Sequence, residues 1–276
     1  MCKLFVAYQC ANVKSLLVKH LHNKENPKYL ECGYAVSWFQ QKHWNTYKCN
    51  CAFATDNKSN ENIDNIQSQT IISHVRSIRN KEMTNTELKN QIVIENVHPF
   101  QYKQNQLIHH GDLFINIDGQ NSPYQISNST NEFKIAVSNI MQHIDKKLQK
   151  QIKGTTDSEI LFYLLLSIQN GLSSTSTPNT DADVIVQSFY IMNKIIKNTS
   201  IENSSSICFT NDKYIAVANI YKNNSGKFIK RVSLYMDDND GIVFCNAKIT
   251  PKSVRVDENT LYLINIQTGD MRVYKL

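Results

Sequence analysis

The N-terminus places a cysteine directly after Met1 and then runs into an apolar, β-prone segment, Leu4 to Tyr8. A thiol needs a base to become a nucleophile, because its ordinary pKa of about 8.5 leaves it mostly protonated at neutral pH. If Met1 is removed, Cys2 gains a free α-amine with a pKa of about 8, which can accept the thiol proton. The pattern therefore indicates an N-terminal cysteine nucleophile, with an ordinary edge strand as the alternative.

Later segments carry polar or charged residues that could surround such a nucleophile. An arginine lies near the end of a predicted strand, a His-Pro-Phe and a His-His-Gly motif follow, and a Thr-Asp-Ser-Glu motif opens a predicted helix. The candidate residues in these segments are Arg76, His98, His110, Gly111 and Asp157. Their order along the chain is more informative than any single motif.

Two of these candidates have strong structural alternatives. Arg76 could form a surface ion pair at a strand end. Thr156 and Glu159 have the spacing of a capping box, and an acid such as Asp157 is favourable in the first turn of a helix. Helix chemistry alone explains this motif, so only its co-occurrence with Arg76 and Cys2 favours a ligand role.

In this order, the segments MCKLF, GYA, HVR, NVHPF, HHG and TDSE resemble the class II glutamine amidotransferases. The likeness covers residues 2–250 and is to the small stand-alone, YafJ-like subfamily that includes the ergothioneine-pathway amidohydrolase. It implies a single domain over residues 1–276. It also implies an α+β fold, a four-layer αββα sandwich of the N-terminal-nucleophile hydrolase type, with two stacked antiparallel sheets and helices outside them.

The resemblance also implies a reaction. The Cys2 thiolate would attack the side-chain amide of glutamine or of a γ-glutamyl compound, release ammonia and leave a thioester for water to hydrolyse. His110 and Gly111 stand where the family has the Asn-Gly pair of its oxyanion hole, and Gly111 can still offer its backbone N–H there. The reaction needs no metal ion and no organic cofactor.

The substrate would be a small molecule with an amino-acid end. By the same resemblance, Arg76 would bind its α-carboxylate, Asp157 would pair with its α-ammonium, and His98 would line the pocket. A guanidinium suits a carboxylate because it can donate two parallel hydrogen bonds to it. Because the chain has no synthetase-like second domain, transfer of ammonia would require an ammonia-accepting partner protein.

Several positions depart from the family pattern. His110 replaces an asparagine, Cys32 stands where an aspartate is usual, Arg79 replaces a threonine, and Asn246–Ile249 replaces a Ser-Glu-Pro segment. Losing one well-placed oxyanion donor typically lowers a rate on the order of a hundredfold. A catalytically degenerate protein that keeps the fold for binding or as a scaffold is therefore the rival hypothesis, and a γ-glutamyl peptide hydrolase is a weaker third one.

The composition limits the class of protein. The chain has 276 residues, 41% of them hydrophobic, and a net charge of +6 whose lysines and arginines are scattered, which does not favour nucleic-acid binding. Neither a membrane span nor a signal peptide is predicted, so we expect a cytoplasmic protein. Seven cysteines at irregular spacing then predict free thiols. Cys49 and Cys51, with Cys32 and His43, fit no standard zinc-finger spacing, so we expect no metal site.

Hydrophobic periodicity predicts strands at both ends of the chain and helices in the middle. One further helix follows the first strand. The expected helices cover residues 12–22, 131–152, 157–172 and 183–198. The expected strands cover residues 2–8, 33–39, 46–54, 70–78, 91–97, 106–110, 206–210, 214–221, 231–236, 241–247, 260–266 and 271–276.

Overall fold

The computed structural model describes residues 2–22, 29–79, 85–115, 131–174, 180–199, 202–223 and 232–276. The chain forms two compact units. The first, unit 1, comprises Met1–His110, Cys208–Lys213 and Ser233–Val256. The second, unit 2, comprises Gly111–Ile207, Tyr214–Val232 and Asp257–Leu276.

The sheet of unit 1 is built around the N-terminal strand. Within the described residues it has seven strands in the order β11-β9-β10-β1-β4-β2-β3. Strand β1 pairs antiparallel with both β10 and β4, and all its residues are buried, so the edge-strand alternative for this segment is wrong. The strands are β1 (Lys3–Tyr8), β2 (Tyr29–Gln40), β3 (His43–Cys49), β4 (Ile71–Arg79), β9 (Tyr235–Asp237), β10 (Ile242–Cys245) and β11 (Val254–Arg255).

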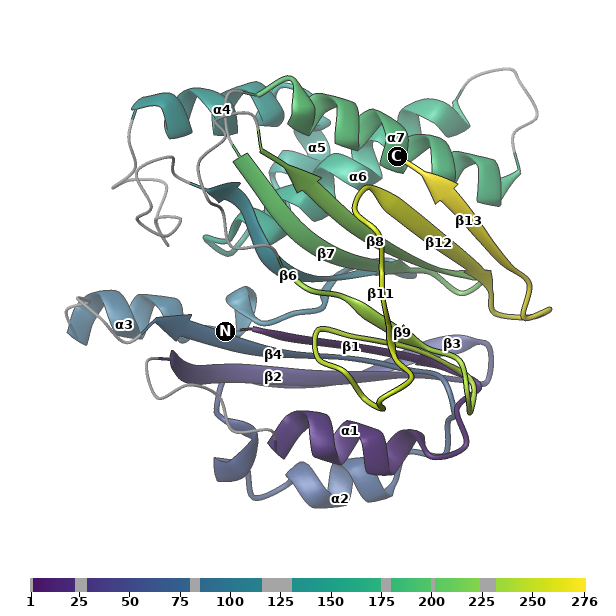
Figure 1. The fold of residues 1–276 in the computed structure, drawn as a ribbon. Helices are drawn as coiled ribbons and strands as arrows, with labels where there is room; N and C mark the ends of the chain where they lie inside the picture. The colour runs from purple at the N-terminus through teal and green to yellow at the C-terminus, as the bar shows by residue number, and fades with distance from the viewer. Residues whose placement is uncertain are drawn as a thin grey trace. The chain divides into compact units, whose positions relative to one another are not determined.

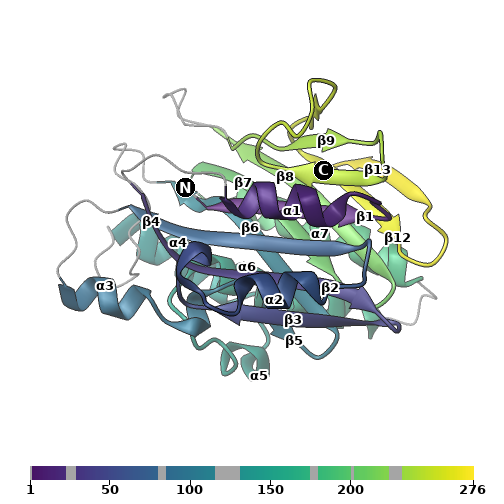
Figure 2. The same cartoon turned by 90° about the horizontal axis from the view of Figure 1, so that it is seen from below.

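Two helices cover one face of this sheet, as Figures 1 and 2 show: α1 (Val13–His22) and α2 (Ser59–Asp64). Helix α1 has its apolar residues at helical spacing, so Val13, Leu17 and Leu21 all face the sheet and are buried. They form a core with side chains of alternate strand positions, which share one face of each strand. The strand members of this core include Phe5, Ala7, Tyr34, Val36, Ile71, Val75, Val243 and Cys245.

The second sheet has the order β13-β12-β8-β7-β6-β5 within the part of the chain that the structure describes. Strand β12 pairs antiparallel with both β8 and β13, and β5 pairs antiparallel with β6. The chain passes from unit 1 to unit 2 within β6, between His110 and Gly111. The strands are β5 (Phe100–Tyr102), β6 (Asn105–Ile115), β7 (Glu202–Thr210), β8 (Tyr214–Lys222), β12 (Thr260–Asn265) and β13 (Met271–Lys275).

Helices of unit 2 pack on its strands. Helix α7 (Asp181–Lys197) contacts β8 and β12 as well as α6 (Asp157–Ser173), and Figure 1 shows both helices on the same face of these strands. Helix α7 begins with a complete capping box between Thr180 and Asp183. These helices and strands match the periodicity of the sequence, so the predictions for residues 157–172 and 183–198 are confirmed.

The expected strand over residues 91–97 is wrong. The segment contains the end of α3 (Asn85–Gln91) and a 3₁₀ turn, η2 (Ile94–Asn96). The Gln91 carbonyl accepts hydrogen bonds from the Arg76 guanidinium at 3.0 Å and from the Asn96 amide at 3.4 Å. The Gln91 carbonyl thus receives its hydrogen bonds from side chains and not from a neighbouring strand. The apolar pattern of the segment could not indicate this, and it wrongly predicted a strand.

The expected helix over residues 131–152 is divided. Helix α4 covers Asn131–Met141, and a short helix, α5, covers Lys146–Gln149. The Asp145 carboxylate accepts the backbone N–H of Lys147 at 2.7 Å and starts α5 as its N-cap. An aspartate inside a helical pattern therefore acted as a cap and began a new helix.

The expected strand over residues 46–54 ends early, because β3 stops at Cys49 and a 3₁₀ turn, η1 (Phe53–Thr55), follows. Cys49 and Cys51 are joined by a disulfide between the end of β3 and η1. The expectation that all cysteines are free thiols is therefore wrong for these two. Cys2, Cys10, Cys32, Cys208 and Cys245 are free.

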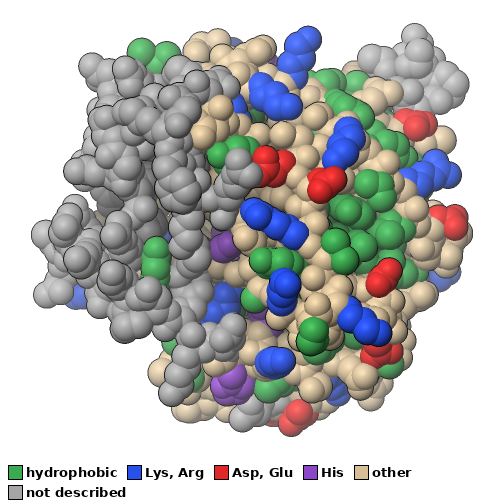
Figure 3. Space-filling model, in the orientation of Figure 1, with side chains coloured by type: hydrophobic (Ala, Val, Ile, Leu, Met, Phe, Trp, Pro, Cys, Tyr) green, Lys and Arg blue, Asp and Glu red, His purple; other side chains and the backbone are tan. Residues whose placement is uncertain are grey.

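The surface carries intermingled charges. On the face drawn in Figure 3, the side chains of Lys and Arg lie among those of Asp and Glu rather than in one patch. Among the described residues, none of the helices has the length and apolar character needed to cross a membrane.

Candidate active site

Cys2 lies at the start of β1, against strand β4. The Ser77 backbone N–H donates to the Cys2 sulfur at 3.4 Å, and the thiol lies 3.5 Å from the Ser77 carbonyl oxygen. Burial raises the pKa of the Cys2 thiol to about 11, against the opposing effects of the Ser77 hydrogen bond and the Arg76 charge. The thiol is therefore neutral at pH 7 in this environment and needs a base next to it to react.

Arg76 lies near Cys2, and its charge acts on the Cys2 thiol. The pairing of β1 with β4 ends with Lys3 opposite Val75, and Cys2 and Arg76 are the next residues beyond this pair. The sequence-predicted nucleophile and the predicted carboxylate ligand are thus brought together.

The Arg76 guanidinium is buried and engaged by the protein itself. It donates to the Gln91 carbonyl oxygen at 3.0 Å, to Gln91 Oε1 at 2.9 Å and to the Cys32 sulfur at 2.7 Å. The side chain is only 4% exposed, so the surface ion pair considered from the sequence is wrong. Burial raises the pKa of the Cys32 thiol, so the guanidinium faces a neutral sulfur and an amide.

A close backbone approach on the other side of Arg76 requires glycine. Gly33 of β2 is opposite Arg76 in the register of β2 and β4. A Cβ atom on Gly33 would lie 2.5 Å from Val97 Cγ2 and 3.1 Å from the Cys49 carbonyl oxygen. Any larger residue would have to displace these neighbours, so Gly33 keeps β2 close to the segment before His98.

Buried histidines accompany Arg76 in unit 1. The rings of His74 and His98 are 4.0 Å apart between centroids, and His98 also contacts Phe100 at 4.7 Å. Burial lowers the pKa of both histidines well below its ordinary value, and the neighbouring histidines and Arg76 lower it further. Neither ring of this pair has a hydrogen-bond partner among the described residues. These histidines are therefore neutral, apolar-packed rings rather than proton carriers at pH 7.

The sequence did not point to His74. A residue two positions before Arg76 in a strand shares its face, so the alternation of β4 was the signal that could have found it. The sequence did not indicate Gln91, the main partner of Arg76, because its segment was predicted to be a strand.

His110 and Gly111 lie in β6. The His110 side chain is buried, at 3% exposure, within unit 1. Gly111 belongs to unit 2 and has a φ of +128°, and a Cβ there would lie 2.1 Å from the Ser204 carbonyl oxygen. Glycine is required at this position because no side chain could be placed without moving the backbone of β7.

Asp157 is the first residue of α6, in unit 2. The N-cap is Thr156, whose side-chain oxygen accepts the Glu159 N–H at 3.4 Å. The Glu159 carboxylate accepts the backbone N–H groups of Lys153 and Gly154 at 3.0 and 2.7 Å. Thr156 and Glu159 thus hold the start of the helix, and the Asp157 carboxylate accepts the Ser158 hydroxyl at 3.3 Å.

The chain was compared with known proteins. No protein-family model matches it, and no curated protein matches its sequence. Among solved structures, a glutamine aminotransferase class-II domain protein from Silicibacter pomeroyi matches with 12% identity and a TM-score of 0.58 over 100% of both chains. The glutamine phosphoribosylpyrophosphate amidotransferase of B. subtilis matches with 13% identity and a TM-score of 0.57, over 100% of this chain and 49% of that chain.

An allosteric regulatory enzyme of purine biosynthesis matches with 14% identity and a TM-score of 0.60, over 99% of this chain and 49% of that chain. The chain has the fold of class II glutamine amidotransferases. The expected fold class, α+β with two antiparallel sheets and helices as in N-terminal-nucleophile hydrolases, is therefore confirmed. The chain spans about half the length of these last two proteins, and at this level of identity the likeness extends to the fold alone.

Proposed function

We propose that this chain, over residues 1–276, is a class II glutamine amidotransferase-type hydrolase that uses Cys2 as its nucleophile. The observation that carries the proposal is the position of Cys2 in this fold: it leads into an internal strand, near the Arg76 charge, with its sulfur 3.4 Å from a backbone N–H donor. Removal of Met1 makes Cys2 the first residue, with its own α-amine as the base.

The reaction proceeds through a thioester. The α-amine takes the thiol proton, and the sulfur attacks the side-chain carbonyl carbon of glutamine or of a γ-glutamyl compound. The Gly111 backbone N–H, with His110, stabilises the oxyanion, and the protonated amine gives its proton to the leaving nitrogen. A water molecule, deprotonated by the amine, then hydrolyses the thioester to glutamate. The Ser77 N–H helps here, because it stabilises the thiolate form of Cys2.

Arg76 and Asp157 bind the two charged groups of the amino-acid end of the substrate, and His98 lines the pocket. A substrate carboxylate competes with Gln91 for the guanidinium, so binding requires Gln91 to give up part of its hydrogen bonding. The substrate is a small molecule and the reaction needs neither a metal ion nor an organic cofactor. A YafJ-like stand-alone enzyme of the cytoplasm would act by simple hydrolysis, whereas coupled transfer would need an ammonia-accepting partner protein.

The second candidate function is binding or scaffolding by a protein that keeps this fold but has lost catalytic activity. Two observations favour it. The Arg76 guanidinium already has three internal acceptors, and burial raises the pKa of Cys2 to about 11. In such a protein, the buried arginine and histidines are structural residues of unit 1.

The two functions are separated by one set of measurements on protein with an unmodified N-terminus. Intact mass reports whether Met1 is removed, and a glutamine-mimicking diazoketone should label Cys2, as located by peptide mass. Release of ammonia and glutamate is then compared between glutamine and γ-glutamyl peptides, which also sorts glutaminase from γ-glutamyl peptide hydrolase. Cys2→Ser is the matched control and should show neither label nor turnover. Retained Met1 and an unlabelled Cys2 would end the catalytic proposal in favour of the scaffold.

A further inference from the structure

A second group of sulfur atoms lies at the end of β3, on residues that the chemistry assigned to Cys2 does not use. Cys49 is the last residue of β3, Asn50 turns the chain, and Cys51 follows, so that only one residue separates the bonded cysteines. Asn50 anchors the turn by donating to the Ile92 carbonyl oxygen at 3.4 Å. Both cysteines are partly exposed.

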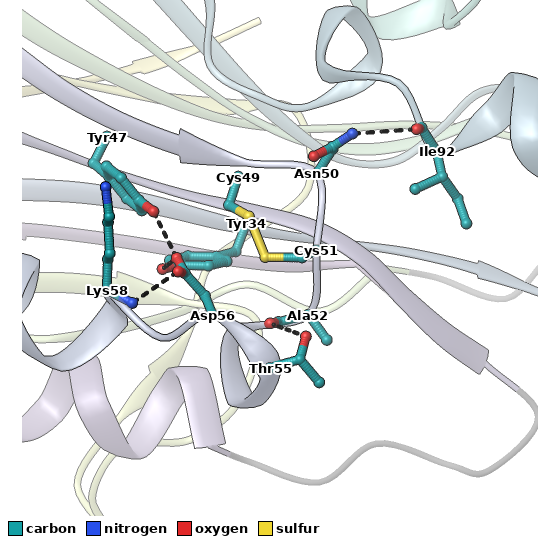
Figure 4. Close-up of a disulfide and its surroundings, with 10 residues drawn as sticks. All are labelled: Tyr34, Tyr47, Cys49, Asn50, Cys51, Ala52, Thr55, Asp56, Lys58 and Ile92. Atoms are coloured by element: carbon teal, nitrogen blue, oxygen red, sulfur yellow. Dashed lines mark hydrogen bonds between the residues drawn. A yellow bond between two sulfur atoms is a disulfide. The ribbon is translucent and has the colours of Figure 1, made fainter.

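A fixed carboxylate lies beside this disulfide, as Figure 4 shows. The sulfurs of Cys49 and Cys51 and a carboxylate oxygen of Asp56 all lie within 4.8 Å of one another. The hydroxyl groups of Tyr34 and Tyr47 each donate to Asp56 Oδ2 at 2.6 Å, and the Lys58 backbone N–H donates to Oδ1 at 2.9 Å. These donors hold the carboxylate in one orientation toward the sulfurs.

The donors that hold the Asp56 carboxylate are two tyrosine hydroxyls and a backbone N–H. All three are neutral groups, so they orient the carboxylate without pairing it with a cationic side chain. Hydrogen-bond donors that orient an anionic ligand are the typical outer shell of a metal site.

We propose that the reduced form of this turn binds a divalent cation of the Zn²⁺ type through Cys49, Cys51 and Asp56. Reduction by a thiol reductant adds two electrons and two protons to the disulfide, and two reductant thiols become a disulfide. Binding of the cation then forms two sulfur–metal bonds and releases the two thiol protons to solvent. The oxidised form, in which the sulfurs are bonded to each other, does not bind the cation.

The donor set decides the class of cation. Two thiolates and a carboxylate suit borderline or soft ions such as Zn²⁺, whereas Mg²⁺ and Ca²⁺ require oxygen ligands. Zinc–sulfur bonds of about 2.3 Å place two sulfurs about 3.7 Å apart in a tetrahedral site, which side-chain rotation within the turn can provide. Three protein ligands on a partly exposed turn leave the fourth position to water.

The test uses Co²⁺ as a spectroscopic substitute for Zn²⁺. The full chain is reduced with a phosphine, desalted without oxygen and titrated with Co²⁺, whose thiolate complexes absorb in the near ultraviolet. We expect one equivalent bound with the absorbance of two thiolates, displacement by Zn²⁺, and no such band for the oxidised protein. A reduced protein without the band would overturn the proposal.

Variants identify the ligands. Cys49→Ser and Cys51→Ser should each lose the two-thiolate band, and Asp56→Asn should weaken binding about tenfold or more. Cys2→Ser is the matched control, because it removes the other partly exposed cysteine, and it should bind Co²⁺ as the unchanged chain does. A band that survives Cys49→Ser, is lost in Cys2→Ser, or is unaffected by Asp56→Asn contradicts the site. If either serine variant fails to fold, the comparison of oxidised with reduced chain still decides, since it needs no substitution.

This proposal is independent of the proposed amide hydrolysis. The Co²⁺ titration measures metal binding at the turn after β3, whereas diazoketone labelling measures the reactivity of Cys2. Each proposal can therefore fail without the other.

Discussion

Two regions of unit 1 place sulfur beside a fixed charge, and they do so in opposite ways. Around Arg76, the guanidinium is buried and hydrogen-bonded to Gln91 and Cys32. Around Asp56, the carboxylate is near the surface, and hydroxyl donors orient it without neutralising it. A buried charge must be satisfied by the protein that buries it, whereas an exposed one can be oriented and still remain available to a ligand.

The largest expected effect separates the two regions by stability. Arg76→Leu leaves the carbonyl and side-chain oxygens of Gln91 without their guanidinium donor, so we expect a loss of about 3–5 kcal/mol in the free energy of unfolding. Asp56→Asn keeps a hydrogen-bonding side chain at the surface and should lower it by about 1 kcal/mol or less. Urea unfolding of both variants measures the difference. Equal losses of unfolding free energy would mean that the protein depends on the hydrogen bonds of the two charged groups to the same extent.

The second expected effect is a pH dependence that belongs to the buried region. Burial lowers the pKa of His20 to about 3, and those of His74 and His98 lie well below the ordinary value, while the unfolded chain has histidine pKa values of about 6.5. Below about pH 6.5 the unfolded state therefore binds protons that the folded state does not. The stability is complete above that pH and falls toward pH 3, by up to about 1.4 kcal/mol per pH unit for each such histidine.

Unfolding in urea at pH 7.5, 6.5 and 5.5 measures this slope. The Asp56 region should not contribute to it, because the lowered pKa of a carboxylate matters only near and below its unfolded value of about 3.9. His43→Gln, at the exposed start of β3, is the matched control and should leave the slope unchanged. A flat profile across this range would mean that the buried histidines accept protons in the folded state.

The third effect concerns turnover. Under the proposed function, an asparagine at position 110 would offer the oxyanion a better-placed donor than His110 does, so His110→Asn should raise the rate of glutamine hydrolysis about tenfold to a hundredfold. Initial rates of ammonia release at saturating glutamine measure it. The double variant Cys2→Ser with His110→Asn is the control and should stay inactive. An unchanged rate in the single variant would mean that His110 does not limit the rate of glutamine hydrolysis. Arg76 and its partner Gln91 would then be the next residues to substitute.

The smallest effect sharpens the description of the Asp56 region. Tyr47→Phe removes one of the two hydroxyl donors to Asp56, so the pKa of this carboxylate should rise and the free energy of unfolding should fall by about 1 kcal/mol. Titration of the Asp56 side chain by NMR and urea unfolding measure the two quantities. Tyr190→Phe, on an exposed helix position, is the control and should change neither. An unmoved pKa would show that Tyr34 alone orients the carboxylate.

Several elements could be predicted because one repeating pattern dominates them. Helix α1 repeats apolar residues every three or four positions, and α7 adds a capping box to the same pattern. Strand β8 is apolar over most of its length, and β4 has β-branched apolar residues at Ile71, Ile72, Val75 and Ile78. In each case local preference and burial favour the same structure, so the sequence window alone is sufficient.

Prediction failed where a specific side-chain contact decides the backbone. Gln91 ends α3, and its carbonyl oxygen accepts a hydrogen bond from Arg76, 15 residues earlier, in a segment predicted as a strand. Asp145 divides a predicted helix by capping a new one, and β3 ends at Cys49, which is bonded to Cys51. Hydrophobic periodicity does not report contacts of this kind.

The candidate sites divide in the same way. The sequence by itself determined that Cys2 leads a strand and that Arg76 lies on another, because alternation and order are local properties. Only the tertiary structure decided that β1 is internal, that Gln91 holds Arg76, and that Asp56 meets Cys49 and Cys51. The physical reason is that a hydrogen bond or a disulfide depends on distance in space, and the folding of the chain sets that distance.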